Sequence, residues 1–299
     1  MDWFVFALIA PILWAGTDVI DKYILANHIK NPFSYQLLTA LTTAPLPFLL
    51  FLLTPISYSF PWSLLTMLAA FVLFSSFVLY FKAMAVEEAS RVISFVYVGP
   101  IFVLPLAFIF LGESLSLSKY LGAMLLVSSA VLISYRRTEG KKSFVISPAL
   151  GFMLTFTLVH AGYEVLAKYI LNSINYWHFL FWWSIGGLLG GFLFLYFPKV
   201  RRDFLSDFRT LSKNVVFWKS ICTCLFFVGV FSYYVAVSLE PISLVATIPS
   251  TEPFFVLLFT VLLSSLMPGM LKEEVDKRTI TMKISAVILI IIGAWLIAG

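Results

Sequence analysis

Two stretches of the chain, 14-WAGTDVIDKYIL-25 and 160-HAGYEVLAKYIL-171, repeat one another. Seven of their twelve positions are identical, and the acidic residue Asp18 of the first stretch is aligned with Glu164 of the second. A match of this kind between distant segments of one chain indicates an internal duplication, which governs the architecture of the whole fold.

A second pair of stretches extends the duplication. The segment 80-YFKAMAVEEASRVISFVYVGPIFV-103 is aligned with 233-YYVAVSLEPISLVATIPSTEPFFV-256, so that Glu87 meets Glu240. The offset between the copies is 146 residues for the first pair and 153 for the second, and a longer connection near 198–214 accounts for the difference.

The composition is that of an integral membrane protein. Of the 299 residues, 61% are hydrophobic and 12% are charged, whereas an ordinary soluble domain is about half apolar and about a quarter charged. These values exclude a soluble enzyme and a disordered chain. Ten apolar segments, each close to the roughly 20 residues that a transmembrane helix requires, run over 3–25, 33–54, 61–84, 91–111, 117–135, 148–171, 176–197, 215–238, 243–265 and 281–298. Because these runs are continuous rather than alternating, they favour helices over a membrane barrel.

The charged connections indicate how the helices cross the membrane. Lysine and arginine residues are frequent in the connections after the odd-numbered segments, and we assign Lys219 to one of these connections. The connections after the fourth, sixth and eighth segments hold only Lys119. Positively charged connections stay on the cytoplasmic side. Since each copy has five segments, the second copy enters the membrane upside down. We therefore expect an all-α protein of ten transmembrane helices in two inverted repeats, 1–137 and 148–299, with both termini extracytoplasmic.

Inverted repeats are typical of secondary transporters, in which the substrate lies near the midplane between the copies and access alternates between the two sides. A duplication that merely enlarges a helix bundle is the alternative interpretation.

The segment 80-YFKAMAVEEASRVISFVYVGPIFVLPLAFIFLGE-113 contains a proline-bearing helix that ends in Gly-Glu. Together with the two sets of five helices, it resembles the drug/metabolite transporter superfamily, and specifically its EamA type. The second copy keeps 252-EPFFVLLFTVLL-263 but continues with Ser264, Ser265 and Leu266 where Gly-Glu would fall, which leaves no partner motif for Glu113. The resemblance implies a basket of helices around a central cavity, with the fifth and tenth helices at the periphery. It also implies transport of amino acids, nucleotides, sugars or other metabolites, often as export.

Charged side chains inside a bilayer usually face a cavity or a partner. His160, Glu164 and Lys168 are spaced i, i+4, i+8 and share one helix face, with Tyr163 beside it. Trp14, Asp18 and Lys22 form the matching stripe in the first copy. The stripes predict carboxyl groups that bind a polar substrate or exchange protons. Ion pairs near the membrane interface, with the lysines reaching toward the headgroups, are the alternative.

Glu252 is a further candidate for substrate binding or proton coupling. It lies between Pro249 and Pro253, beside Ser250, within an apolar run. We expect these prolines to kink the helix and to free backbone groups. The matching position of the first copy is Gly99, next to Pro100 and near Tyr97, and this segment should be kinked in the same way. The alternative is a carboxyl satisfied by a neighbouring hydroxyl or lysine.

Aromatic and glycine clusters give further expectations. Tyr80, Tyr233 and Tyr234 occupy corresponding helix ends, where they line the cavity or belong to the interfacial aromatic belt; we expect the belt. An interfacial position is also expected for Trp177, Trp182, Trp183 and His178. The glycines at 186, 187, 190 and 191 form overlapping GxxxG steps, which we interpret as close packing inside the bundle rather than as a dimer interface.

The sequence thus predicts a secondary-active transporter of a small polar or amphipathic metabolite, such as an amino-acid-like compound. The chain lacks a GxxxxGK[ST] loop, so an ion gradient would supply the energy, with proton coupling and export as options. A passive channel and an intramembrane lipid-processing enzyme are the alternatives, although neither HExxH nor GxSxG occurs. We expect no cofactor, no metal and no nucleic-acid partner. We also expect a prokaryotic-type cell membrane and a monomer, with a homodimer as the alternative.

Overall fold

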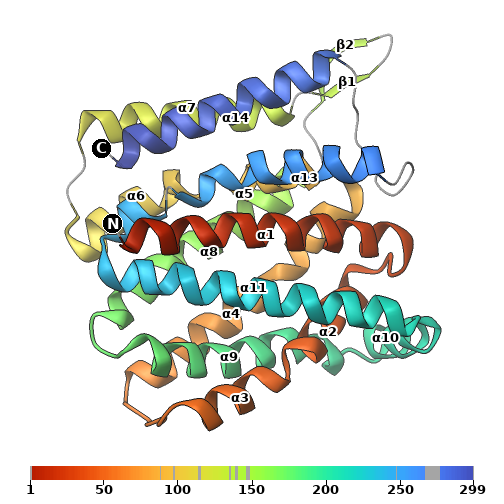
Figure 1. Ribbon diagram of the computed structural model, residues 1–299, viewed down its shortest axis with the longest axis vertical. Helices are drawn as coiled ribbons and strands as arrows, with labels where there is room; N and C mark the ends of the chain where they lie inside the picture. Colours follow the sequence, from red (N-terminus) through yellow and green to blue (C-terminus); the bar gives the residue numbers. More distant parts are fainter. Residues whose placement is uncertain are drawn as a thin grey trace.

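The computed structural model describes residues 2–87, 89–96, 98–113, 116–134, 136–138, 141–145, 149–246, 248–266 and 277–298. Figure 1 shows an elongated bundle of helices that lie roughly side by side. Among the described residues, six helical stretches are long and apolar enough to cross a membrane: Trp3–Asn27, Pro32–Leu53, Trp62–Val86, Ala149–Leu171, Tyr176–Tyr196 and Lys213–Leu239. The chain is therefore a multi-pass integral membrane protein.

The first half of the chain forms seven helical pieces. They are α1 (Asp2–Asn27), α2 (Pro32–Thr43), α3 (Pro45–Leu53), α4 (Trp62–Val86), α5 (Ala89–Val96), α6 (Pro100–Leu111) and α7 (Leu117–Ser134).

The second half begins with a short hairpin and continues as helices. Its elements are β1 (Arg136–Thr138), β2 (Lys141–Val145), α8 (Ala149–Leu171), α9 (Tyr176–Phe192), η1 (Leu193–Tyr196), α10 (Pro198–Thr210), α11 (Lys213–Leu239), α12 (Ile242–Val245), η2 (Ile248–Thr251), α13 (Glu252–Leu266) and α14 (Lys277–Ala298). The helix pairs in closest contact are α1 with α11, α4 with α8 and α9, and α7 with α14.

Proline interrupts the helices more strongly than the sequence analysis expects. Pro100 begins α6 after α5 has ended at Val96, so the predicted kink is a complete break. In the second half, Pro249 lies in η2 and Pro253 follows the first residue of α13. A proline ring removes a backbone donor and clashes with the preceding turn, which explains both breaks. Glu252 consequently lies at the N-terminus of a half-helix, not in the middle of a continuous one.

Two connections hold structure that the sequence analysis left out. The charged segment near 136–142 contributes to a short antiparallel hairpin in which Arg136 pairs with Val145 and Thr138 with Lys141. The long connection contains α10, an amphipathic helix rich in charged residues.

The glycines of α9 pack inside the bundle, as predicted. A Cβ atom added at Gly186 would collide with the carbonyl oxygen of Met67 on α4, and one at Gly190 would collide with that of Phe71. The small residues let the two backbones touch, so this face of α9 is covered by α4 of the same chain.

The last residues of α6 link the two halves. Gly112 has a φ of 70°, in the left-handed region that glycine tolerates, and it ends α6. The turn places Glu113 so that its Oε2 accepts a hydrogen bond from the Ser243 backbone N–H of α12, at 3.2 Å. The Gly-Glu motif therefore joins the end of α6 to a short helix of the second half.

The two ends of the described chain lie at the same end of the bundle. Figure 1 shows the beginning of α1 and the end of α14 close to the left edge, and α7 and α14 side by side as the uppermost layer. The helices that surround the cavity lie below that layer.

Candidate substrate cavity

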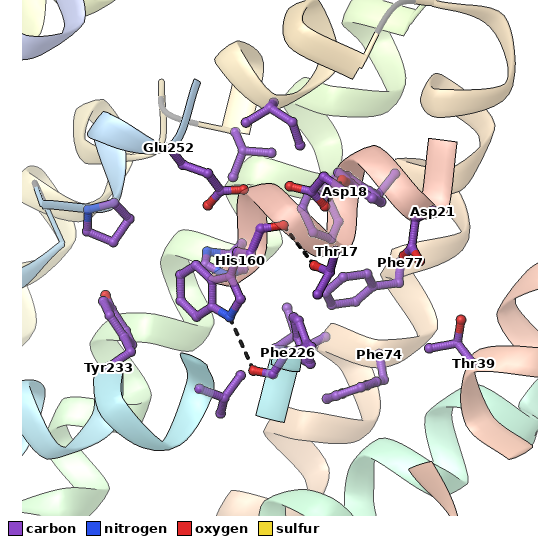
Figure 2. A pocket seen from close by; sticks show the side chains of 18 of the residues that line it. Thr17, Asp18, Asp21, Thr39, Phe74, Phe77, His160, Phe226, Tyr233 and Glu252 are labelled. Atoms are coloured by element: carbon purple, nitrogen blue, oxygen red, sulfur yellow. Dashed lines mark hydrogen bonds between the residues drawn. The ribbon is translucent and has the colours of Figure 1, made fainter. Parts of the chain in front are cut away.

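A cavity lies between helices of the first and second halves of the chain. Residues of α1, α2, α4, α5, α8, α9, α11 and α13 line it, together with Gly99 and Pro100 at the α5–α6 break and Pro249 of η2. The centre of a water-sized molecule can occupy about 150 Å³ of it. Figure 2 shows side chains of these helices converging on this space.

Most of the predicted site residues line this cavity: Trp14, Asp18, His160, Tyr163, Glu164, Glu252, Pro100 and Pro249. Pro253 is buried beside Glu252 but is not part of the lining. Tyr97 lies outside the described residues, and the same holds for the side chain of Ser250.

Asp18 and Glu252 meet in the cavity. Figure 2 shows their carboxyl groups pointing toward each other, one from α1 and one from the start of α13. The Tyr80 hydroxyl donates to Asp18 Oδ1, at 2.6 Å. Asp18 therefore lies between a tyrosine hydroxyl of α4 and a second carboxyl group, that of Glu252.

Glu164 has an environment that parallels that of Asp18. Its Oε1 accepts a hydrogen bond from the Tyr233 hydroxyl at 2.7 Å and lies 3.8 Å from His160 Nδ1. Tyr80 and Tyr233 are aligned in the duplication, and each donates to the carboxyl that the duplication also aligns. The same contact thus recurs in both halves of the chain.

The prediction that these tyrosines belong to the interfacial belt is wrong. Tyr80, Tyr233 and Tyr234 are all buried and line the cavity. Tyr234 donates to the Tyr163 hydroxyl at 2.8 Å. A buried tyrosine hydroxyl needs a hydrogen-bond partner, and the cavity supplies it.

Lys22 and Lys168 join neighbouring helices instead of lining the cavity. Each ammonium group donates to two carbonyl oxygens at the C-terminal end of a long helix, where the backbone leaves acceptors unused and cations are favoured. The acceptors are Met84 O (2.6 Å) and Glu87 O (2.5 Å) for Lys22, and Val237 O (2.8 Å) and Glu240 O (2.9 Å) for Lys168. The structure thus places Lys168, a predicted binding residue, away from the cavity lining.

A buried ion pair was missed by the sequence analysis. Lys219 Nζ lies 2.9 and 3.0 Å from the two carboxylate oxygens of Asp21, and the Tyr35 hydroxyl donates to Asp21 Oδ1 at 2.6 Å. Lys219 is only 3% exposed and belongs to α11, so its assignment to a cytoplasmic connection is wrong. Its position inside the apolar run 215–238 is the sequence signal that could have revealed it.

Two buried polar groups on the cavity wall lack a hydrogen-bond partner within the described part of the chain: Gln36 Oε1 and Trp183 Nε1. Gln36 does use its Nε2, which donates to the Phe74 carbonyl at 3.0 Å. The interfacial prediction for Trp183 is wrong, since it is 4% exposed and faces the cavity. Its neighbour Trp182 lies at the surface, where Nε1 donates to Ser57 O at 3.1 Å.

No group of three or more histidine, cysteine or acidic residues that could hold a metal occurs among the described residues. The cavity lining offers carboxyl, hydroxyl, imidazole, ammonium, amide, indole and thiol groups.

Residues 1–135, which include α1 to α7, match the model of the EamA-like transporter family. This part of the chain is similar to that family. The EamA region lies within the drug/metabolite transporter superfamily, and the match confirms the resemblance seen in the sequence. The proteins of this family are membrane transporters.

A crystal structure of another protein has the same overall fold as this chain. It is 14% identical in sequence and superimposes with a TM-score of 0.59 over 98% of this chain and 95% of that one. At this identity the likeness concerns the fold alone. No curated protein matches the sequence.

Proposed function

We propose that the protein is a secondary-active transporter of a small polar or amphipathic metabolite, driven by a proton gradient through alternating access. The observation that carries this proposal is the Asp18–Glu252 pair, in which carboxyl groups from the two halves of the chain meet inside a membrane-embedded cavity. Ionisable groups in the membrane are costly and are usually retained for a coupling or binding role.

We further propose that 1–137 and 148–299 are inverted five-helix repeats. The antiparallel contact of α1 with α11 supports this arrangement. Trp14 Nε1 donates to the Phe226 carbonyl at 3.3 Å. Asp21, nearer the C-terminus of α1, contacts Lys219, which is nearer the N-terminus of α11. Lys168 donates to the last carbonyls of α11, and this end of α11 lies beside the beginning of α1. Lys22, in contrast, lies near the end of α1. Equivalent lysines therefore act at opposite ends of the bundle, as inversion requires.

The broken helices support a binding site beside the α5–α6 break and the break at η2. Discontinuous helices occur in many transporters at the substrate site, because freed backbone groups are tolerated only beside a cavity or another protein segment. Gly99, Pro100 and Pro249, at the two breaks, all line the cavity. On this proposal the odd-numbered connections are cytoplasmic and both termini are outside the cell membrane.

The proposal is tested by uptake into proteoliposomes. Vesicles containing wild-type protein would be given radiolabelled amino acids, amines, sugars and nucleosides, with and without a pH gradient. We expect saturable, gradient-dependent uptake of at least one class, and a loss of at least tenfold in Glu252→Gln and Glu164→Gln. Asp207→Asn on α10, away from the cavity, is the matched control. Ion conductance in a planar bilayer without saturable uptake would show that the protein is a channel and not a carrier. Uptake that is unchanged in both variants would contradict the proposed role of these carboxyl groups in proton coupling.

A further inference from the structure

The charges that line the cavity favour a positively charged ligand. Lys219 contacts both oxygens of Asp21, so this pair adds little net charge to the space. Asp18, Glu164 and Glu252 also face the cavity, and His160 lies beside Glu164. Even when Asp18 and Glu252 share one proton, that pair and Glu164 leave negative charge in a site of low polarity. Such charge is expensive unless further protons or a bound cation neutralise it, and a bound cation does so without requiring every carboxyl to be protonated.

The remaining lining indicates what kind of cation fits. The carboxyl groups stand among aromatic rings, including Trp14, Phe77, Phe156 and Phe226. Phe77 lies 5.1 Å from Phe156 and 6.4 Å from Phe226, measured between ring centroids. Aromatic faces attract organic ammonium groups, which need not carry the tightly held water of a metal ion. A ligand with an apolar body and an ammonium group therefore suits this wall.

Two other residues of the lining offer a second, neutral recognition point. Gln36 Oε1 is an acceptor and Trp183 Nε1 is a donor, both are buried, and neither has a partner among the described residues. They flank Phe74, because Gln36 Nε2 donates to its carbonyl at 3.0 Å and the Trp183 ring packs on its ring at 5.0 Å. Figure 2 shows Phe74 well apart from Glu252. Buried polar groups are normally satisfied, so this acceptor and donor indicate a ligand that supplies both bonds.

Resting on the transport function proposed above, we propose that the substrate is an amphipathic amine with a neutral hydroxyl or amide at its other end. Its ammonium group binds at Asp18 and Glu252, and its hydroxyl donates to Gln36 Oε1 and accepts from Trp183 Nε1. Gln36 and Trp183 thereby act as specificity-determining residues for the neutral end.

Four related probes separate the two recognition points. Tyramine carries both an ammonium and a hydroxyl group, phenethylamine lacks the hydroxyl, tyrosol replaces the ammonium with a neutral alcohol, and 4-hydroxyphenylacetate replaces it with a carboxylate. Binding to purified full-length protein in detergent would be measured by titration calorimetry. We expect tyramine to bind at least about tenfold more tightly than tyrosol and the acid, and about two- to tenfold more tightly than phenethylamine, the range that one or two hydrogen bonds supply.

Variants assign each end of the probe to its residues. Trp183→Phe should weaken tyramine severalfold and leave phenethylamine unchanged, whereas Glu252→Gln should weaken both amines. Gln36→Met removes the other polar atom while keeping a side chain of similar shape. If Trp183→Phe does not fold, Gln36→Met should likewise weaken tyramine and leave phenethylamine unchanged. The proposal is overturned if tyrosol or the acid binds as well as tyramine, if both amines respond equally to Trp183→Phe and Gln36→Met, or if no probe binds. Because these measurements concern binding at equilibrium, their failure would overturn the amine proposal but would leave the transport of another solute class possible. Tyramine binding without any flux would instead contradict the proposed transport function and leave the binding site in place.

Discussion

Asp18 and Glu252 are separated by 234 positions in the chain, yet their carboxyl groups point toward each other inside the cavity. One residue comes from the long helix α1, and the other is the first residue of the half-helix α13. Any movement of α13 relative to α1 changes this contact. On the function proposed above, the pair would couple the protonation of the cavity to the relative position of the two halves.

The two tyrosine–carboxyl contacts should be energetically similar. Tyr80→Phe and Tyr233→Phe each remove one hydroxyl that donates to a buried carboxyl, at 2.6 and 2.7 Å respectively. We expect each change to lower the free energy of unfolding by about 1 kcal/mol. Unfolding of each variant in a titration with SDS measures the effect. A loss from only one of the two variants would contradict the structural equivalence of the sites.

The buried Lys219–Asp21 pair should be essential for stability. Lys219→Met leaves the Asp21 carboxylate buried without its ammonium partner, and we expect a loss of about 3–5 kcal/mol. The double variant Lys219→Met, Asp21→Asn should be more stable than the single variant, because no unpaired charge remains. A double-mutant cycle from SDS unfolding measures the coupling. Additive losses would show that the two side chains do not interact.

The contact of α9 with α4 should not tolerate a methyl group. Gly190→Ala would force the added carbon against the Phe71 carbonyl, so we expect a loss of about 1–3 kcal/mol, as for an overpacked core. Gly162→Ala on α8 is the matched control, because apart from its chain neighbours and the backbone of its own helix nothing lies within 4 Å of the added carbon. A helical alanine should stabilise that site by up to about 1 kcal/mol. Equal effects of the two changes would contradict the packing.

The two ends of the chain should lie on one side of the membrane. The start of α1 and the end of α14 occupy the same end of the bundle in Figure 1. Reporter enzymes that are active on only one side, fused to Met1 and Gly299 in turn, should give the same result in cells. Opposite results would exclude an even number of crossings and, with it, the inverted repeats.

The sequence predicts the helices well but not their breaks. Apolar runs locate α1, α4, α8 and α11 to within a few residues. The run 243–265 looks like one helix, whereas the chain forms α12, η2 and α13 there. Hydrophobicity marks residues that avoid water, and it does not show how many backbone bonds a proline removes.

Most cavity residues could be predicted because the duplication and the helical spacing both select them. Asp18 and Glu164 are aligned charged residues in apolar segments, and both line the cavity. Their hydroxyl partners, and the partner of Asp21, come from helices distant in sequence, so only the folded chain reveals them. Trp182 and Trp183 illustrate a finer limit, since adjacent helical residues point about 100° apart and only one of them faces the cavity.

Proton movement through the protein tests the central claim most directly. Proteoliposomes that contain a pH-sensitive dye would receive members of the four solute classes, with wild-type protein, Glu252→Gln and the control Asp207→Asn compared side by side. We predict that at least one solute class drives proton movement in wild type and in Asp207→Asn, and that none does so in Glu252→Gln. Proton movement in wild type no greater than in protein-free vesicles, or an undiminished signal in Glu252→Gln, would contradict the account.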